Sequence, residues 1–149
     1  MPPVSSARLA DVPPVTLYRI LWLRVSVFVV EQRAAYPELD GRDLEPGTEL
    51  FWIEEDAQVV ATLRLLRDAG GAARIGRVAT AAHARGRGLS AELMRAAVAR
   101  ADERWPGAPI DLDAQKHLAG WYGRFGFEVS GAEFAEDGIP HVPMRRGAR

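Results

Sequence analysis

The sequence predicts an α/β fold in which one mixed sheet carries helices on both of its faces. Two observations favour this class. In the first half, short apolar segments are separated by turns rich in glycine and acidic residues, as in antiparallel hairpins. In the second half, apolar strands alternate with helical segments, a pattern typical of strand–helix–strand units. At 149 residues the chain is expected to form one domain, 1–149, with a sizeable core.

The composition is that of an ordinary globular protein, with 48% apolar and 26% charged residues. The net charge of −1 provides no overall field that would attract nucleic acid or an anionic membrane. No cysteine is present, which excludes disulfides and thiolate catalysis. The most apolar segment, 15–30, contains Arg19 and Arg24 and is too short for a membrane span. We also find no signal-peptide pattern, and therefore expect a cytoplasmic protein.

One helix and three strands are predicted in the N-terminal half. Residues 1–14 are rich in proline, and we expect them to be flexible or to form a short strand around 4–9. A helix is predicted over 15–30, and the apolar residues on one face of it are Leu17, Leu21, Val25 and Phe28. A loop over 33–49 follows, with room for a short helix. The predicted strands are 50–53, 59–66 and 74–80.

The C-terminal half alternates helices with strands. The first helix spans 88–104 and ends at the helix-breaking sequence Trp105-Pro106-Gly107. A second helix over about 116–125 stops before Gly126. Strands are predicted around these helices at 110–114, 127–131 and 141–145. Helices that connect strands in this way cover both faces of a sheet.

The stretch from Arg77 to Met94 is the most informative part of the chain. An apolar strand leads into a loop, a helix follows directly, and the loop contains Arg85, Gly86, Arg87 and Gly88. Glycine lets a backbone approach an anion closely, and the N–H groups of a helix start point at that anion with the positive end of the helix dipole. The guanidinium groups add charges whose geometry suits phosphate. We therefore expect a phosphorylated cofactor at this loop.

Two other kinds of nucleotide loop fit this stretch less well. A P-loop needs Gly-x-x-x-x-Gly-Lys-Ser/Thr, which the sequence lacks. The dinucleotide fingerprint Gly-x-Gly-x-x-Gly/Ala is met by Gly86, Gly88 and Ala91. However, residues 81–85 separate the strand from the first glycine, and too little chain follows for a doubly wound sheet. A dinucleotide-binding oxidoreductase is therefore kept only as the less favoured alternative.

Two motifs resemble those of the Gcn5-related N-acetyltransferase (GNAT) superfamily. Residues 85–90, Arg-Gly-Arg-Gly-Leu-Ser, resemble its pyrophosphate loop Arg/Gln-x-x-Gly-x-Gly/Ala, with Ser90 in place of the last small residue. Residues 121–127, Trp-Tyr-Gly-Arg-Phe-Gly-Phe, resemble its Tyr-x-x-x-Gly-Phe signature. Gln115 stands where that superfamily often has asparagine. The two motifs occur in the order of the superfamily, separated by one predicted helix and one predicted strand.

The N-terminal half is similar to the ElaA-type subfamily. The residues that carry this likeness are 23–24, 27–32, Tyr36, 40–43 and 136–141. The resemblance implies a GNAT-type fold with a mostly antiparallel mixed sheet, and acetyl-CoA as the cofactor. It also implies direct transfer of the acetyl group to an amine through a ternary complex. We expect the acceptor to be a small-molecule or peptide amine. A CoA-binding protein without catalysis remains the alternative function. For the oligomeric state, a homodimer remains an alternative to a monomer.

The resemblance also implies roles for individual residues. Tyr122 is the candidate acid for the departing thiolate, because a phenol stays protonated at neutral pH; packing beside Trp121 is the alternative. Gln115 either bonds the cofactor arm or caps the next helix. Strand 78–80 is expected to splay from its neighbour, so that its backbone binds the pantetheine arm and polarises the acetyl carbonyl. The full predicted cofactor set is Val78, Ala79, Thr80, Arg85, Gly86, Arg87, Gly88, Leu89, Ser90 and Gln115.

Carboxylates and a histidine are the candidates for the acceptor side. Glu31 ends an apolar helix, so we expect it to have a raised pKa, to form the polar centre of an acidic pocket and to take part in catalysis. The base itself stays open, with His117 and His141 as further candidates because imidazole titrates in the suitable range. A salt bridge with Arg24 or Arg33 is the alternative for Glu31. The residues predicted to surround a cationic amine are Asp40, Asp43 and His141, together with Glu136 and Asp137. The three histidines lack metal-ligand spacing, so no metal site is expected.

Overall fold

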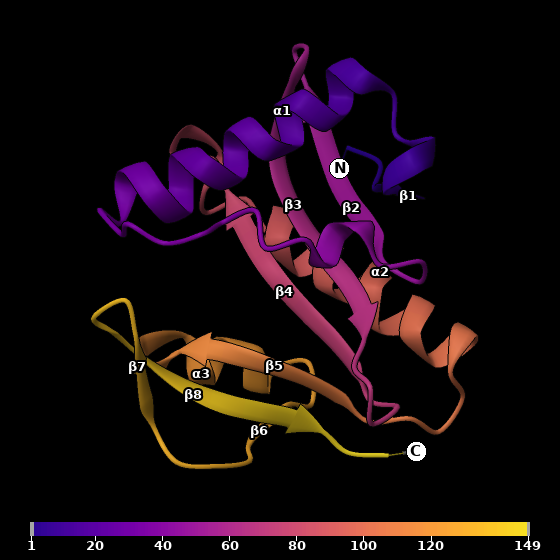
Figure 1. Ribbon diagram of the computed structural model, residues 1–149, viewed down its shortest axis with the longest axis vertical. Helices are drawn as coiled ribbons and strands as arrows, with labels where there is room; N and C mark the ends of the chain where they lie inside the picture. The colour runs from indigo at the N-terminus through magenta and orange to yellow at the C-terminus, as the bar shows by residue number, and fades with distance from the viewer. Residues whose placement is uncertain (1, 149) are drawn as a thin grey trace.

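An eight-stranded sheet forms the centre of the computed structural model, which describes residues 2–148 (Figure 1). The strands lie in the order β1-β2-β3-β4-β5-β8-β6, and β7 pairs with β8 off this path. Within these residues only β4 and β5 run parallel, which confirms the predicted mixed, mostly antiparallel sheet. The strands are β1 Ser5–Arg8, β2 Glu49–Glu55, β3 Gln58–Arg67, β4 Ala73–Thr80, β5 Ile110–Gln115, β6 Glu128–Val129, β7 Phe134–Glu136 and β8 Ile139–Arg146.

Helices cover both faces of this sheet, as predicted, with α1 (Pro14–Val25) on one face and α2 (Leu89–Arg104) on the other (Figure 1). A π-helical segment over Ser26–Glu31 continues α1. The predicted helix 116–125 is shorter than expected, because α3 (Ala119–Gly123) is preceded by a 3-10 turn. The 3-10 turns are Leu9–Asp11, Arg42–Leu44, Ala82–Ala84 and Lys116–Leu118. No helix within residues 2–148 has both the length and the apolar character needed to cross a bilayer.

Strand β2 separates the two halves of the core. Successive side chains of a strand point to opposite faces of the sheet. Accordingly, Leu50 and Trp52 pack in the cluster that contains residues of α1, whereas Phe51 and Ile53 pack in the cluster that contains residues of α2. Strands β3 and β4 also contribute to both clusters, with Val59 and Ala79 in the cluster of α1 and Leu63 and Ile75 in the cluster of α2.

The buried face of α1 differs from the predicted one. Ile20, Leu23 and Val27 are buried against the sheet. The residues expected there are half-buried or, at Val25, exposed: Leu17, Leu21, Val25 and Phe28. Apolar residues lie nearly all around this helix, so their spacing alone did not determine which stripe meets the sheet.

Strands β4 and β5 separate along their length. Their parallel pairing is confined to Ala73–Ile110 and Arg74–Asp111, and beyond these residues the strands diverge (Figure 1). On its other side β4 stays paired with β3, but it carries a β-bulge at which Arg77 has a φ of 54°. A bulge bends its strand and increases the local twist. The backbone of the second half of β4 therefore has no strand partner on the β5 side, as the resemblance implied.

Candidate active site

Two adjoining cavities lie where β4 and β5 diverge. The first, here called the loop cavity, has a volume of about 680 Å³ and is lined by the loop before α2. The second, called the hairpin cavity, has a volume of about 580 Å³ and is lined by the β7–β8 hairpin. Both volumes suit small molecules. The residues that line both cavities are Phe28, Gln32, Val78, Gln115, Leu118 and Tyr122.

The loop cavity brings together most of the residues predicted to bind the cofactor. Those that line it are Val78, Ala79, Thr80, Arg85, Gly86, Gly88, Leu89, Ser90 and Gln115. Arg87 is the exception and does not line the cavity. Its half-exposed guanidinium instead pairs with Glu55 of β2, through hydrogen bonds of 2.7 and 2.6 Å. Arg87 is thus held outside this cavity, and its cofactor role stays a prediction.

The loop from Arg85 to Ser90 has the geometry of an anion cradle. Gly86 and Gly88 have φ values of 80° and 78°, a conformation that glycine adopts without strain, and a Cβ at either position would meet only open space. Among residues 2–148 no side chain caps the start of α2, so the first N–H groups of this helix can bond a ligand. The hydroxyls of Thr80 and Ser90 share a hydrogen bond, which ties the end of β4 to the start of α2.

Glu31 forms an ion pair in the loop cavity. Arg85 donates two hydrogen bonds to its carboxylate, at 2.8 and 2.7 Å, and a third to the Thr80 carbonyl at 3.0 Å. The bonds from Arg85 lower the pKa of Glu31 and outweigh the opposing effect of burial. The predicted raised pKa is therefore wrong. Glu31 lines the loop cavity and not the hairpin cavity. The salt bridge expected as the alternative is present, but its partner is Arg85 and not Arg24 or Arg33.

Tyr122 of α3 lies at the junction of the two cavities. Its side chain is 7% exposed and contacts the rings of Trp121 and Phe127, with centroid distances of 4.9 and 6.5 Å. Burial raises the pKa of Tyr122 to about 12. Within residues 2–148 its hydroxyl has no hydrogen-bond partner. Tyr122 therefore both packs against aromatic neighbours and presents a hydroxyl that is free to donate.

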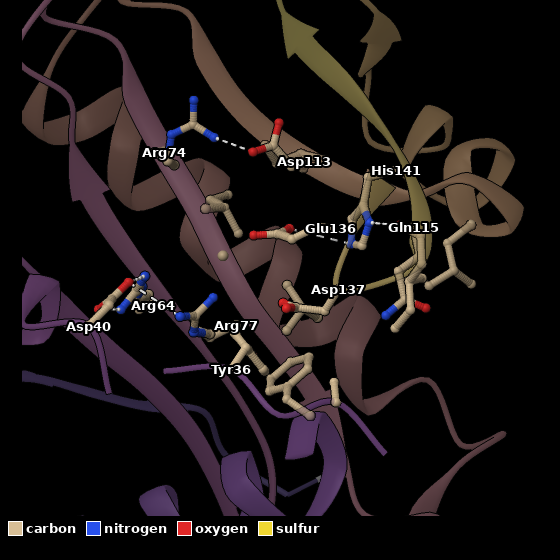
Figure 2. Close-up of a pocket in the computed structure, with 18 of the residues that line it drawn as sticks. Tyr36, Asp40, Arg64, Arg74, Arg77, Asp113, Gln115, Glu136, Asp137 and His141 are labelled. Atoms are coloured by element: carbon tan, nitrogen blue, oxygen red, sulfur yellow. Dashed lines mark hydrogen bonds and ion pairs between the residues drawn. The ribbon is translucent and has the colours of Figure 1, made fainter. Parts of the chain in front are cut away.

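Arginines line the β3–β4 wall of the hairpin cavity, and each is held by a carboxylate (Figure 2). Arg64 of β3 donates to Asp40 at 2.8 and 2.7 Å, and Arg77 of β4 lies 2.9 Å from Glu38. Arg74 of β4 and Arg42 of the turn 42–44 both pair with Asp68, at 2.8 and 3.0 Å. None of these arginines was predicted to line the acceptor side, although a charge within the apolar strand 59–66 was a signal for Arg64.

Two carboxylates predicted to bind the acceptor belong to this network. Hydrogen bonding from Arg64 holds the pKa of Asp40 well below its usual range. Asp43 is buried with Arg24 at 2.7 Å and does not line the cavity, so its predicted contact with the acceptor is corrected. Burial acts to raise the pKa of Asp43, but the hydrogen bond and charge of Arg24 lower it overall. Both carboxylates thus hold the cavity wall in place.

The opposite wall of the hairpin cavity carries carboxylates and an imidazole (Figure 2). Glu136 and Asp137 come from the β7–β8 hairpin, and Asp113 comes from β5. Asp113 lies 3.4 Å from the guanidinium of Arg74, whereas Glu136 lies 3.7 Å from the imidazole of His141. His141, on β8, is 8% exposed and stands directly opposite Gln115 in the β5–β8 register. The structure thus places His141 in the cavity, as predicted.

Comparison with known sequences gives consistent matches over most of the chain. A family model described as an acetyltransferase (GNAT) domain matches residues 23–147. UPF0039 protein Rv2851c of Mycobacterium tuberculosis is 49% identical over 140 residues, which are 91% of this chain and 87% of that protein. Protein ElaA of Escherichia coli is 37% identical over 132 residues, which are 87% of this chain and 86% of ElaA.

Solved structures give the same result. An acyl-CoA N-acyltransferase from Pseudomonas aeruginosa superposes with a TM-score of 0.93 and 41% identity, over 99% of this chain and 100% of that one. The crystal structure of E. coli ElaA superposes with a TM-score of 0.92 and 32% identity over 98% of this chain and 99% of ElaA, a longer alignment than the sequence match. The chain therefore belongs to the GNAT acetyltransferase family, and within it to the ElaA type.

Proposed function

We propose that this protein transfers an acyl group, acetyl in the first place, from an acyl-CoA to an amine while both are bound. The observation that carries this proposal is the junction of the two cavities, where Tyr122 and Val78 line both. A donor in the loop cavity and an acceptor in the hairpin cavity would meet there. Direct transfer then needs no nucleophile from the protein to carry the acyl group between them.

The loop cavity fits an acyl-CoA. Gly86, Gly88 and the start of α2 would hold the pyrophosphate. Arg85 lines the same cavity, and it would have to leave Glu31 or share its guanidinium to bind the pyrophosphate as well. Val78, Ala79 and Thr80 are paired with β3 or bulged on one side only, and on the β5 side their backbone would bond the pantetheine arm. The Thr80 carbonyl already accepts a hydrogen bond from Arg85, and Gln115 lines the same cavity. When bound, acyl-CoA supplies a thioester whose carbonyl carbon is open to attack by an amine. An aminoglycoside 6'-N-acetyltransferase in complex with coenzyme A has the same fold, with a TM-score of 0.71 at 10% identity.

Tyr122 would donate a proton to the departing thiolate. Its raised pKa keeps the phenol protonated throughout the neutral range, and its hydroxyl has no partner within residues 2–148 to compete for it. General acid catalysis by a positioned group typically contributes about 10²- to 10⁴-fold to a rate.

The hairpin cavity favours a cationic amine as acceptor. Carboxylates outnumber guanidiniums in and directly behind its wall. The carboxylates are Glu38, Asp40, Asp43, Glu45, Asp68, Asp113, Glu136 and Asp137, and the guanidiniums are Arg24, Arg42, Arg64, Arg74 and Arg77. Because the arginines are already paired, the charge left for a ligand is that of Glu136 and Asp137. Small-molecule amines and peptide amines both carry the positive charge that these carboxylates would attract.

One continuous sheet supports the view that the chain acts as a single domain.

The test is thiol release from acetyl-CoA with a panel of acceptors. We expect release with spermidine, n-butylamine or a lysine peptide, and none with butyrate. Calorimetric titrations measure the binding of CoA and of NAD in parallel. Binding of CoA without release by any amine would favour a non-catalytic CoA-binding protein, and binding of NAD alone would favour the dinucleotide alternative. The cytoplasmic location and a homodimer remain predictions of the sequence.

A further inference from the structure

We propose that His141 is the general base that takes the proton of the attacking amine. This inference rests on the proposed acyl transfer and names a group that the transfer requires. An amine that adds to a thioester must lose a proton, and a base must lie on the acceptor side to take it. His141 lies on that side, in the cavity that Tyr122 also lines.

The hydrogen bond of His141 selects its tautomer. Nδ1 lies 2.7 Å from the backbone carbonyl oxygen of Ile139. A carbonyl oxygen only accepts hydrogen bonds, so Nδ1 carries the hydrogen. In the neutral ring Nε2 therefore holds a free lone pair, which is the atom a general base uses. The backbone of β8 thus fixes which nitrogen of the ring is basic.

The position of the ring is fixed by its neighbours. Phe134 of β7 stacks on it, with a centroid distance of 5.7 Å and an angle of 24° between the planes. On β8 the residue stands opposite Gln115, which lines both cavities. Figure 2 shows the ring reaching from β8 into the cavity beside Glu136. The imidazole is therefore buried, oriented and close to the junction where transfer is proposed.

Other bases in or near the cavities are less suitable. Asp40 is bonded by Arg64 and Arg77, which hold its pKa well below its usual range and make it a weak base. Glu31 is bonded by Arg85 and lies in the loop cavity. Glu136 is less suitable because its side chain is half exposed to solvent. Its Oε2 lies 3.7 Å from Nε2 of His141. That carboxylate is well placed to stabilise the imidazolium once the proton has moved.

The step balances without any further reagent. The bound ammonium first loses one proton to solvent, which frees the lone pair of its nitrogen. As that nitrogen bonds the carbonyl carbon, His141 Nε2 accepts the second proton from it. As the carbon–sulfur bond breaks, the sulfur leaves with the bonding electron pair and Tyr122 donates its phenolic proton to it. The products are an amide and a free thiol. The imidazolium then loses its proton to solvent and the phenolate regains one, so both residues return to their first state.

Charged groups from several elements face His141. The groups that share its cavity are Glu136 and Asp137 of the hairpin, Asp113 of β5, Arg74 and Arg77 of β4, Arg64 of β3, Asp40, Arg42 and Asp68 of the loops, and Tyr36 and Tyr122. A base must be unprotonated to act, so the rate should fall on the acidic side as the imidazole becomes protonated. A variant without the imidazole should lose that dependence.

The tautomer can be measured in the free protein by long-range ¹H–¹⁵N spectra of the histidine rings. His141→Gln assigns the signals, because the chain has only two other histidines. We expect a protonated Nδ1 and an unprotonated Nε2 at pH 7.5. A ring protonated at Nε2 at this pH, in either the other tautomer or the imidazolium form, would overturn the proposal.

The role in turnover is tested with the fastest amine of the panel above. His141→Gln should lower kcat/KM about 10²-fold, leave CoA affinity unchanged and flatten the acidic limb of the pH profile. Added imidazole should restore turnover to His141→Ala, and the exposed His83→Gln serves as the matched control. An unchanged rate and pH profile in His141→Gln would overturn the proposal. Failure of the proposed function would look different, since wild-type protein itself would then release no thiol with any amine.

Discussion

The loop cavity and the hairpin cavity are built in different ways. The loop cavity presents backbone: two glycines with positive φ, the uncapped start of α2 and the unpaired edge of β4. The hairpin cavity presents side chains, which form ion pairs between segments far apart in the chain, such as Arg77 with Glu38. Backbone can bind a cofactor part common to a whole family, whereas side chains can differ from one acceptor to another. Substitutions should therefore separate the two cavities experimentally.

The largest expected effect is on stability, from Arg24→Leu. Arg24 is 1% exposed and pairs with Glu38 and Asp43 at 2.8 and 2.7 Å. Its loss takes the nearest guanidinium from two buried carboxylates, which keep Arg77 for Glu38 and, at 3.5 Å, Arg64 for Asp43. Breaking a buried pair in this way costs about 3–5 kcal/mol. Denaturant unfolding measures the change, and Arg19→Leu on the same helix is the control. A loss below about 1 kcal/mol would mean that this network does not hold the cavity wall.

The next effect is on turnover, from Tyr122→Phe. The substitution keeps the ring packing and removes the hydroxyl at the junction of the cavities. We expect kcat to fall by roughly 10²-fold or more with little change in CoA affinity. Steady-state kinetics and calorimetry give the two values, with the exposed Tyr18→Phe as control. Equal losses of binding and turnover would instead indicate a packing role.

Acid should weaken the wall of the hairpin cavity through Asp43. Its pKa is lowered in the folded state, so its contribution to stability is present above the unfolded pKa of about 3.9 and is lost as pH falls through the lower folded value. At pH 7 we expect Asp43→Asn to cost about 2 kcal/mol, the scale of a hydrogen bond to a charged group. Unfolding measured against pH should show the difference from wild type shrinking below about pH 4. A difference that stays constant down to pH 2 would contradict this.

The cradle of the loop cavity should respond to Gly88→Val. Gly88 has a φ of 78°, which valine tolerates poorly, and the added side chain would occupy the open space above the loop. We expect acetyl-CoA affinity to fall at least tenfold while the ion pairs of the hairpin cavity stay intact. Calorimetry measures the affinity, with Gly70→Val in an exposed turn as the control. A Gly88→Val variant that binds acetyl-CoA as tightly as the wild type would show that the pyrophosphate lies elsewhere.

The smallest expected effect distinguishes two arginines of the same loop. Arg85 lines the loop cavity, whereas Arg87 pairs with Glu55 outside it. Arg85→Gln should therefore weaken CoA binding by roughly fivefold, the scale of one lost charge-assisted hydrogen bond. Arg87→Gln should change it by less than about twofold. Similar losses in both variants would keep Arg87 in the cofactor set.

The fold and the loop cavity could be predicted from the sequence because their signals are local. The glycines at 86 and 88 lie beside the helix start that they serve, and Tyr122 lies within its own motif. The strand β7 was missed because Phe134–Glu136 is short and exposed and has no apolar alternation. The buried stripe of α1 was misplaced by about one residue because apolar side chains surround that helix.

The ion pairs of both cavities were harder to predict because the two partners of each pair are distant in the chain. Glu31 ends an apolar helix, and its true partner, Arg85, lies on a loop that the sequence alone did not place beside it. Asp43 was expected to face an acceptor, but the buried Arg24 draws it into the wall. Ion pairs depend on where the fold brings segments together, so local patterns show a charge but not its partner.

A crystal structure of the protein with CoA tests the division of the site most directly. We expect the pyrophosphate against Gly86, Gly88 and the start of α2, with the pantetheine arm along β4. The sulfur should then lie at the junction of the cavities, beside the hydroxyl of Tyr122, and the hairpin cavity should remain free for an acceptor. CoA bound outside the loop cavity, or an arm that does not enter the space between β4 and β5, would contradict this division.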